Sequence, residues 1–254
     1  MEKNNLFSAS RFILLIKRFI ILNIKTWAIG LAAATGLIIL IAIAQAFLFG
    51  ISFNYNGLVN FGLVQIFIGG FIVASMAFKE LNSPARSQFY LTMPASTLEK
   101  LLSHWFVTSI LFIVVANILL AFAISLSSVF CNLIWGSAIE YFNPFAIANL
   151  KIMATFLVLH SIFFLGATYF RKNNFIKTVL VIFIISQILM VFMIIITFLL
   201  FKSGNPYMSE NIINTEFQLV FESTFKNLVQ IAYFGLLAPF CLLVSYFRLK
   251  EREV

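Results

Sequence analysis

Six long apolar stretches fill most of this 254-residue chain, and the segments between them alternate in charge. A helix that spans a membrane needs about 20 mostly apolar residues, and each stretch is long enough. Only 10% of the residues are charged, against roughly 25% in soluble domains. The sequence therefore predicts an all-α, polytopic membrane protein that forms one domain over residues 1–254. The predicted spans are 27–49, 58–78, 105–130, 145–170, 178–201 and 227–247.

The Lys and Arg residues divide unequally between the two sides of this predicted bundle. Fourteen of the 17 fall in the N-terminal segment, in the loops that follow the second and fourth spans, and at the C-terminus. Only Lys151, Lys202 and Lys226 fall on the other side. Short cytoplasmic loops are enriched in Lys and Arg, so we expect both termini in the cytoplasm. The net charge of +8 then reflects orientation in a membrane, and we expect no nucleic-acid partner.

Residues 6–24 carry a helical pattern of their own. Arg11, Arg18 and Lys25 recur every seven residues and make one basic stripe, with apolar residues over the rest of the surface. This pattern predicts a helix that lies in the membrane interface, with its cations near lipid phosphates. The alternative is a basic flank that only orients the first span. On the other side, apolar residues at helical spacing predict a second amphipathic helix over 217–228.

The sequence contains few of the residues that catalysis requires. It has no Asp and two His, no HExxH or GxSxG pattern, and no Glu inside a predicted span. We therefore predict no catalytic residues and no metal site. It also has no GxxxxGK[ST] motif, so it cannot bind ATP in a P-loop. Any work that the protein performs must draw its energy from another subunit.

Four polar residues inside the predicted spans are candidates for a translocation path, because polar groups are costly in lipid. They are Gln65, Asn117, His160 and Gln187. The alternative is that each forms a hydrogen bond between helices, worth about 1 kcal/mol or less.

The segment 79–104 is the longest predicted cytoplasmic loop, and it combines charged residues with apolar ones. Phe89, Tyr90 and Leu91 are residues that a free loop would not leave exposed, so they need a membrane or a protein partner. Pro94 ends the first part of the loop. Ser96 then caps the next helix, and Glu99 three residues later completes a capping box.

This loop resembles the loop between the second and third spans of type 2 ABC exporter permeases. That family carries the pattern Glu-Leu, Arg, Tyr-Leu-Thr-Leu-Pro-Ala-Ser and Glu-Lys there, and Met93 here replaces the more usual Leu. The matching positions are Glu80, Leu81, Arg86, Tyr90, Leu91, Thr92, Met93, Pro94, Ala95, Ser96, Glu99 and Lys100. The likeness covers about 25 residues, and the six spans with inward termini are also similar to that family.

The resemblance implies a function that these residues alone do not show. The chain would be the transmembrane permease subunit of an exporter for a hydrophobic, lipid-like or drug-like substrate, in the bacterial cytoplasmic (inner) membrane. It would not itself be an enzyme, and ATP and Mg would be bound by a partner, a cytoplasmic ABC ATPase subunit. The permease would pair with a second copy or with a second permease subunit, among membrane lipids. The implied coupling residues are Glu80, Arg86, Phe89, Tyr90, Leu91, Pro94 and Glu99.

Two other classes of function are consistent with the sequence. One is a membrane-embedded scaffold or sensor without transport, in which 79–104 is a solvated connector along the membrane. Its Glu80, Arg86, Glu99 and Lys100 would then be ordinary surface charges. The other is an intramembrane enzyme that uses His104 or His160.

Overall fold

The computed structural model describes residues 7–49, 54–136, 141–202, 226, 227 and 229–253, and these residues form helices and connections without a β-strand. Six of the helices are long and apolar enough to span a membrane, which confirms the predicted fold class. The elements are α1 (Ala9–Phe49), α2 (Tyr55–Ser75), η1 (Lys79–Asn82), α3 (Pro84–Leu91), α4 (Thr97–Phe106), η2 (Val107–Leu111), α5 (Phe112–Trp135), α6 (Ile147–Tyr169), α7 (Asn174–Lys202), η4 (Ala232–Leu237) and α9 (Ala238–Glu253). The amphipathic helix predicted over 217–228 falls almost entirely outside the described residues.

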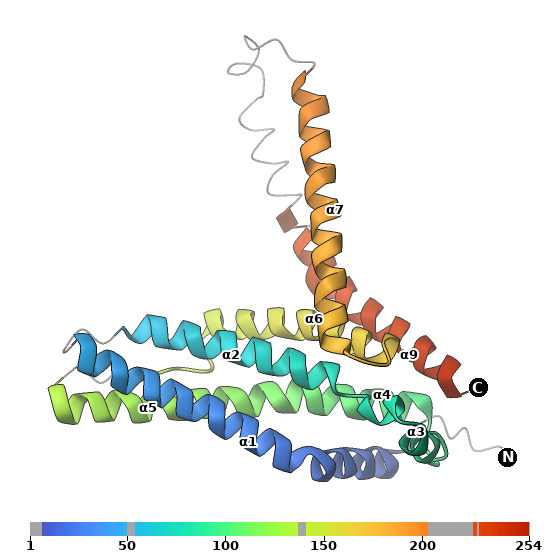
Figure 1. Ribbon diagram of the computed structural model, residues 1–254, viewed down its shortest axis with the longest axis horizontal. Coiled ribbons are helices and arrows are strands. Elements are labelled where there is room, and N and C mark those ends of the chain that lie inside the picture. Colours follow the sequence, from blue (N-terminus) through green and yellow to red (C-terminus); the bar gives the residue numbers. More distant parts are fainter. Residues whose placement is uncertain (1–6, 50–53, 137–140, 203–225, 228, 254) are drawn as a thin grey trace.

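Helix α1 unites two elements that the sequence analysis predicted as separate. It runs without interruption through 41 residues, roughly 61 Å at 1.5 Å per residue, about twice the hydrocarbon thickness of a bilayer. Its first turns, in the darkest blue, run in a different direction from the rest (Figure 1). Lys25 does not end the helix, because its side chain is exposed and α1 contains no Pro.

Four of the long helices, α1, α2, α5 and α6, form the bundle (Figure 1). Its central core joins α1, α2 and α5 through buried aliphatic side chains that include Ile38, Leu58, Ile66, Leu120 and Ile124. A second core lies where α4, α6 and α9 meet the segment that follows α2. Its buried members are Ala77, Phe78, Tyr90, Leu101, Phe164, Ala167 and Leu249.

Glycines set the closest helix crossings in the bundle. A Cβ atom on Gly62 would meet the side chain of Leu120, and one on Gly70 would meet the ring of Phe156. Small residues let helix backbones approach closely where lipid offers no hydrophobic driving force. These crossings fix how α2 packs on α5 and α6.

Helix α7 leaves the bundle at a steep angle (Figure 1). Its apolar side chains from Val179 to Ile195 are exposed, and its contact with α6 centres on Gly166 and Thr178. The corner before it contains Asn173, whose φ of 53° lies in the left-handed region, which Asn tolerates better than most residues. Spanning helices lie within about 40° of the bilayer normal, so all six spans fit one bilayer only when α7 turns toward the bundle at this corner.

The basic segments gather at one end of the bundle, which we call the basic end. Arg18 of α1 forms an ion pair with Glu80 at 3.1 Å, and Arg252 of α9 donates to the carbonyl oxygen of Tyr169 at 3.1 Å. The N-terminal part of α1, the segment 79–104, the end of α6 and the end of α9 therefore meet, as the distribution of Lys and Arg predicted.

Candidate coupling surface and membrane groove

The segment 79–104 folds into short helices, and their ends follow from local sequence. Pro84 stands in the first turn of α3, where its missing N–H is tolerated. The capping box at the start of α4 is confirmed: Glu99 N donates to Ser96 Oγ at 3.2 Å, and Ser96 N donates to Glu99 Oε2 at 2.9 Å. Pro94 is exposed in the connection between α3 and α4.

Glu99 does more than cap a helix. Its side chain is fully buried, Ser8 N donates to Oε1 at 2.5 Å, and Arg11 lies 3.2 Å from the same oxygen. Burial raises the pKa of Glu99, whereas the hydrogen bonds from Ser96 and Ser8 and the charge of Arg11 lower it, and the balance leaves it below its ordinary value. The helix that starts at Thr97 continues for 38 residues, roughly 57 Å, so its first turn lies outside the hydrocarbon layer. Glu99 thus joins this turn to the start of α1.

A second pair of contacts joins η1 to α1. Glu80 accepts hydrogen bonds from Arg18 at 3.1 and 3.3 Å, and Lys79 Nζ donates to Asn23 Oδ1 at 2.7 Å. Glu80, Glu99 and the buried Lys100 are therefore not ordinary surface charges. The description of 79–104 as a solvated connector is wrong for these three residues. The first turns of α1 hold the segment at both of its ends.

An aromatic cluster lies beneath α3, and sequence reasoning assigned it no common site. His104 of α4 packs against the rings of Phe19, Phe78 and Tyr90, with centroids 4.3, 5.1 and 5.7 Å away. Its Nδ1 lies 2.7 Å from the carbonyl oxygen of Lys100. Lys100 is buried too, with Nζ 5.4 Å from the Tyr90 ring. No local pattern indicated this cluster, because its rings come from α1, the segment after α2, α3 and α4.

The outer face of α3 remains available to a partner. Arg86 is exposed, and Phe89 is 64% exposed with the guanidinium of Arg18 5.7 Å from its ring centre. Tyr90, the next residue, is buried in the second core, and Leu91 is the last residue of α3. Arg86 and Phe89 of α3 thus form an exposed face, whereas Tyr90 anchors the same helix in the second core.

The four candidates for a translocation path have different surroundings. Asn117 accepts a hydrogen bond from Asn149 at 3.3 Å, which joins α5 to α6 as the alternative interpretation expected. Gln187 is exposed on α7. Gln65 lines the groove described below. These three residues thus have different surroundings: a contact between helices, an exposed helix face and the wall of the groove.

His160 occupies an unusual environment in α6. It is fully buried between Phe156 and Phe164, with ring centroids 5.6 and 6.1 Å away. Neither ring nitrogen makes a well-formed hydrogen bond, although the backbone of Thr108 lies near enough to interact. Thr108 belongs to η2, a π-helical turn, and such turns often mark functional positions.

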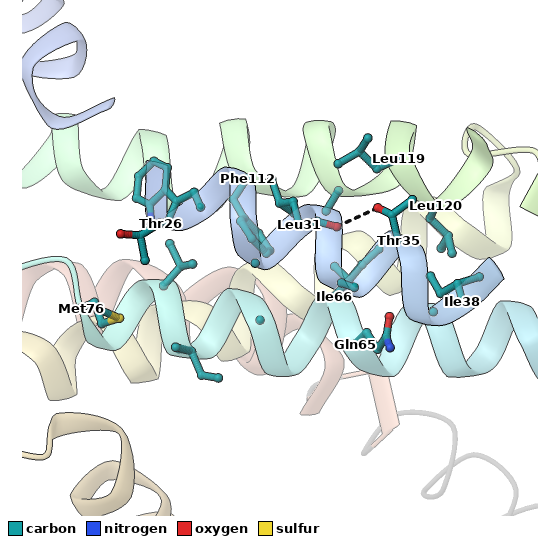
Figure 2. A pocket seen from close by; sticks show the side chains of 18 residues that line it. Thr26, Leu31, Thr35, Ile38, Gln65, Ile66, Met76, Phe112, Leu119 and Leu120 are labelled. Atoms are coloured by element: carbon teal, nitrogen blue, oxygen red, sulfur yellow. Dashed lines mark hydrogen bonds between the residues drawn. The ribbon is translucent and has the colours of Figure 1, made fainter. Parts of the chain in front are cut away.

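A groove of about 340 Å³ lies between α1, α2 and α5 (Figure 2). Thr26 and Met76 lie at one end of it, and Ile38 and Gln65 at the other. The lining is apolar apart from three uncharged residues, Thr26, Thr35 and Gln65. Its volume falls in the range of small-molecule sites in proteins.

Among the described residues no group of three or more His, Cys, Asp or Glu side chains is placed to hold a metal ion. The fold and the contacts at the basic end together define the class of this protein. It is a multi-pass, all-helical membrane protein with an anchored segment at its basic end. Comparison of the chain with family models, with curated proteins and with solved structures finds no match.

Proposed function

We propose that this chain is the permease subunit of an ATP-driven exporter, and that α3 is the element through which a separate ATPase subunit acts on it. The proposal rests on the resemblance of 79–104 to type 2 ABC permeases. The observation that carries it is the division of α3 between an exposed face and a buried anchor. A force on the outer face would reach α4 through Tyr90.

The contacts of the segment support this role. A coupling element must be accessible to the ATPase and firmly joined to the spans that it moves. Arg86 and Phe89 meet the first requirement, because both are exposed. The ion pairs of Glu80 and Glu99 meet the second, because they join the segment to α1. The charge of Arg86 suits an acidic surface on the partner.

The test is purification of the tagged protein in mild detergent, with mass spectrometry of the proteins that accompany it. We expect an ATPase with a P-loop to accompany the wild type and to be lost from the double variant Arg86→Glu/Phe89→Glu. Reversal of a charge at a contact costs several kcal/mol in affinity, enough to abolish recovery. Lys172→Glu is the matched control, because Lys172 is exposed at the same end of the bundle, and it should leave recovery unchanged.

Two results would contradict the proposal. Recovery of the ATPase with the double variant would remove α3 from the contact. Absence of any P-loop ATPase from the wild type, even after crosslinking in the membrane, would contradict the exporter itself and favour a scaffold or sensor.

A further inference from the structure

The groove between α1, α2 and α5 is long and narrow. Along α1 it extends from Thr26 to Ile38, roughly 18 Å of helix. Gly30 faces open space, with no atom within 4 Å of an added Cβ. About 340 Å³ over this length suits one extended hydrocarbon chain.

One polar atom in the wall lacks a partner. Oε1 of Gln65 accepts no hydrogen bond and is covered by neighbouring atoms, although other atoms of Gln65 line the groove. Its position in Figure 2 is beside Ile38, at the end away from Thr26. An amide oxygen without a donor is costly in an apolar medium, because a bilayer core contains no water to satisfy it. Rotation of the amide about χ3, a torsion with a broad range, would turn this oxygen toward the groove. A ligand with a hydroxyl or an amide N–H would then supply the missing donor.

The charge of the groove lining and the free energy of binding from lipid restrict the kind of ligand further. None of the residues that line the groove is charged, so a charged head group would lose its solvation without compensation. Moving a hydrocarbon chain from lipid into an apolar groove gains little, because lipid is equally apolar. Selective binding therefore has to come from shape and from the hydrogen bond to Gln65.

We propose that the groove is a binding site for an uncharged, single-chain amphiphile. Its hydrocarbon part lies along α1 and α2, and its hydroxyl or amide group donates to Oε1 of Gln65. This site does not depend on the proposed exporter function, since a scaffold or a sensor can bind the same ligand.

The test uses a long-chain alcohol with a photoreactive diazirine on its alkyl chain and the full-length protein in phospholipid nanodiscs. After irradiation, mass spectrometry locates the labelled residues. We expect labelling on 26–38 and 62–76 that excess dodecan-1-ol displaces. Replacement of the acceptor by Gln65→Leu should weaken this binding about fivefold, the effect of losing one hydrogen bond. Gly30→Leu should abolish it by filling the groove.

A matched glycine separates occupation of the groove from damage to the fold. Gly36 also lies in α1 with no atom within 4 Å of an added Cβ, and it does not line the groove. Gly36→Leu should therefore label like the wild type. Ala34→Phe, a second substitution in the lining, should block labelling as Gly30→Leu does, with unfolding temperatures compared for every variant.

Exposed apolar side chains of α5 outside the groove, such as Ile118 and Phe122, report simple partition into lipid. Labelling spread evenly over these positions and the groove, or labelling that Gly30→Leu and Ala34→Phe leave unchanged, would overturn the site. A diazirine-tagged phosphatidylcholine distinguishes the source of the chain. Stronger labelling by the alcohol supports the hydrogen bond to Gln65. Equal labelling by both probes would contradict that hydrogen bond and would show that the groove holds an acyl chain of bulk lipid.

Discussion

At the scale of single residues, the strongest contacts of the basic end converge on Glu99. Glu99→Gln keeps the shape of the side chain but removes its charge, so it weakens the contacts with Arg11 and Ser8. Lost hydrogen bonds to a charged group cost about 1–3 kcal/mol, and we expect thermal unfolding in detergent at a correspondingly lower temperature. Glu251→Gln is the control: Glu251 pairs with Arg248 at 2.6 Å but is 63% exposed, and such pairs contribute little.

The same residue predicts how stability depends on pH. Because the pKa of Glu99 is lower in the folded protein than its ordinary 4.5, its stabilisation is complete above about pH 4.5 and is lost as the pH falls through the folded value. The stability difference between wild type and Glu99→Gln should therefore be constant from pH 7 to 5 and shrink below pH 4.5. A difference that grows as the pH falls would contradict the role of the carboxylate.

At the scale of helices, the sequence was informative where the determinants are local. The capping box needs only Ser96 and Glu99, three residues apart, and it forms as predicted. The partner of the same Glu99, Arg11, stands 88 residues earlier, and nothing in either local pattern indicates the other. The continuity of α1 was missed for a different reason. Lys25 interrupts the run of apolar residues, but it leaves the helical backbone intact.

Glycine positions give the helix crossings a direct test. At Gly70 an added methyl group meets the ring of Phe156, which is fully buried and cannot move aside. Overpacking of this kind costs about 1–3 kcal/mol, so Gly70→Ala should lower the unfolding temperature. Gly36→Ala, where the added group meets nothing, should be neutral or stabilising by up to about 1 kcal/mol. Equal effects of the two substitutions would mean that α2 and α6 do not cross at Gly70.

At the scale of the whole molecule, hydropathy alone predicted the number of spans, because a continuous stretch of about 20 apolar residues is typical of a membrane-spanning helix. It did not predict the groove, which depends on the faces that α1, α2 and α5 turn toward one another. Nor did it predict the direction of α7. From Val179 to Ile195 only Ser186 and Gln187 are polar, and a helix that is apolar on nearly all sides gives no pattern to show which side packs against the bundle.

Six crossings of one bilayer require that the basic end and the opposite end of the bundle face different compartments. In a background with Cys131→Ala and Cys241→Ala, single cysteines at exposed positions test this with a membrane-impermeant maleimide. Arg86→Cys and Lys172→Cys, at the basic end, should react only after the membrane is opened, because Lys and Arg are retained in the cytoplasm. Asn56→Cys, beside the start of α2, should react in intact cells. Three spans separate Asn56 from Lys172, so the two positions should react from opposite sides. Reaction of both from the same side would require an even number of spans between them, and the six-span arrangement would be wrong.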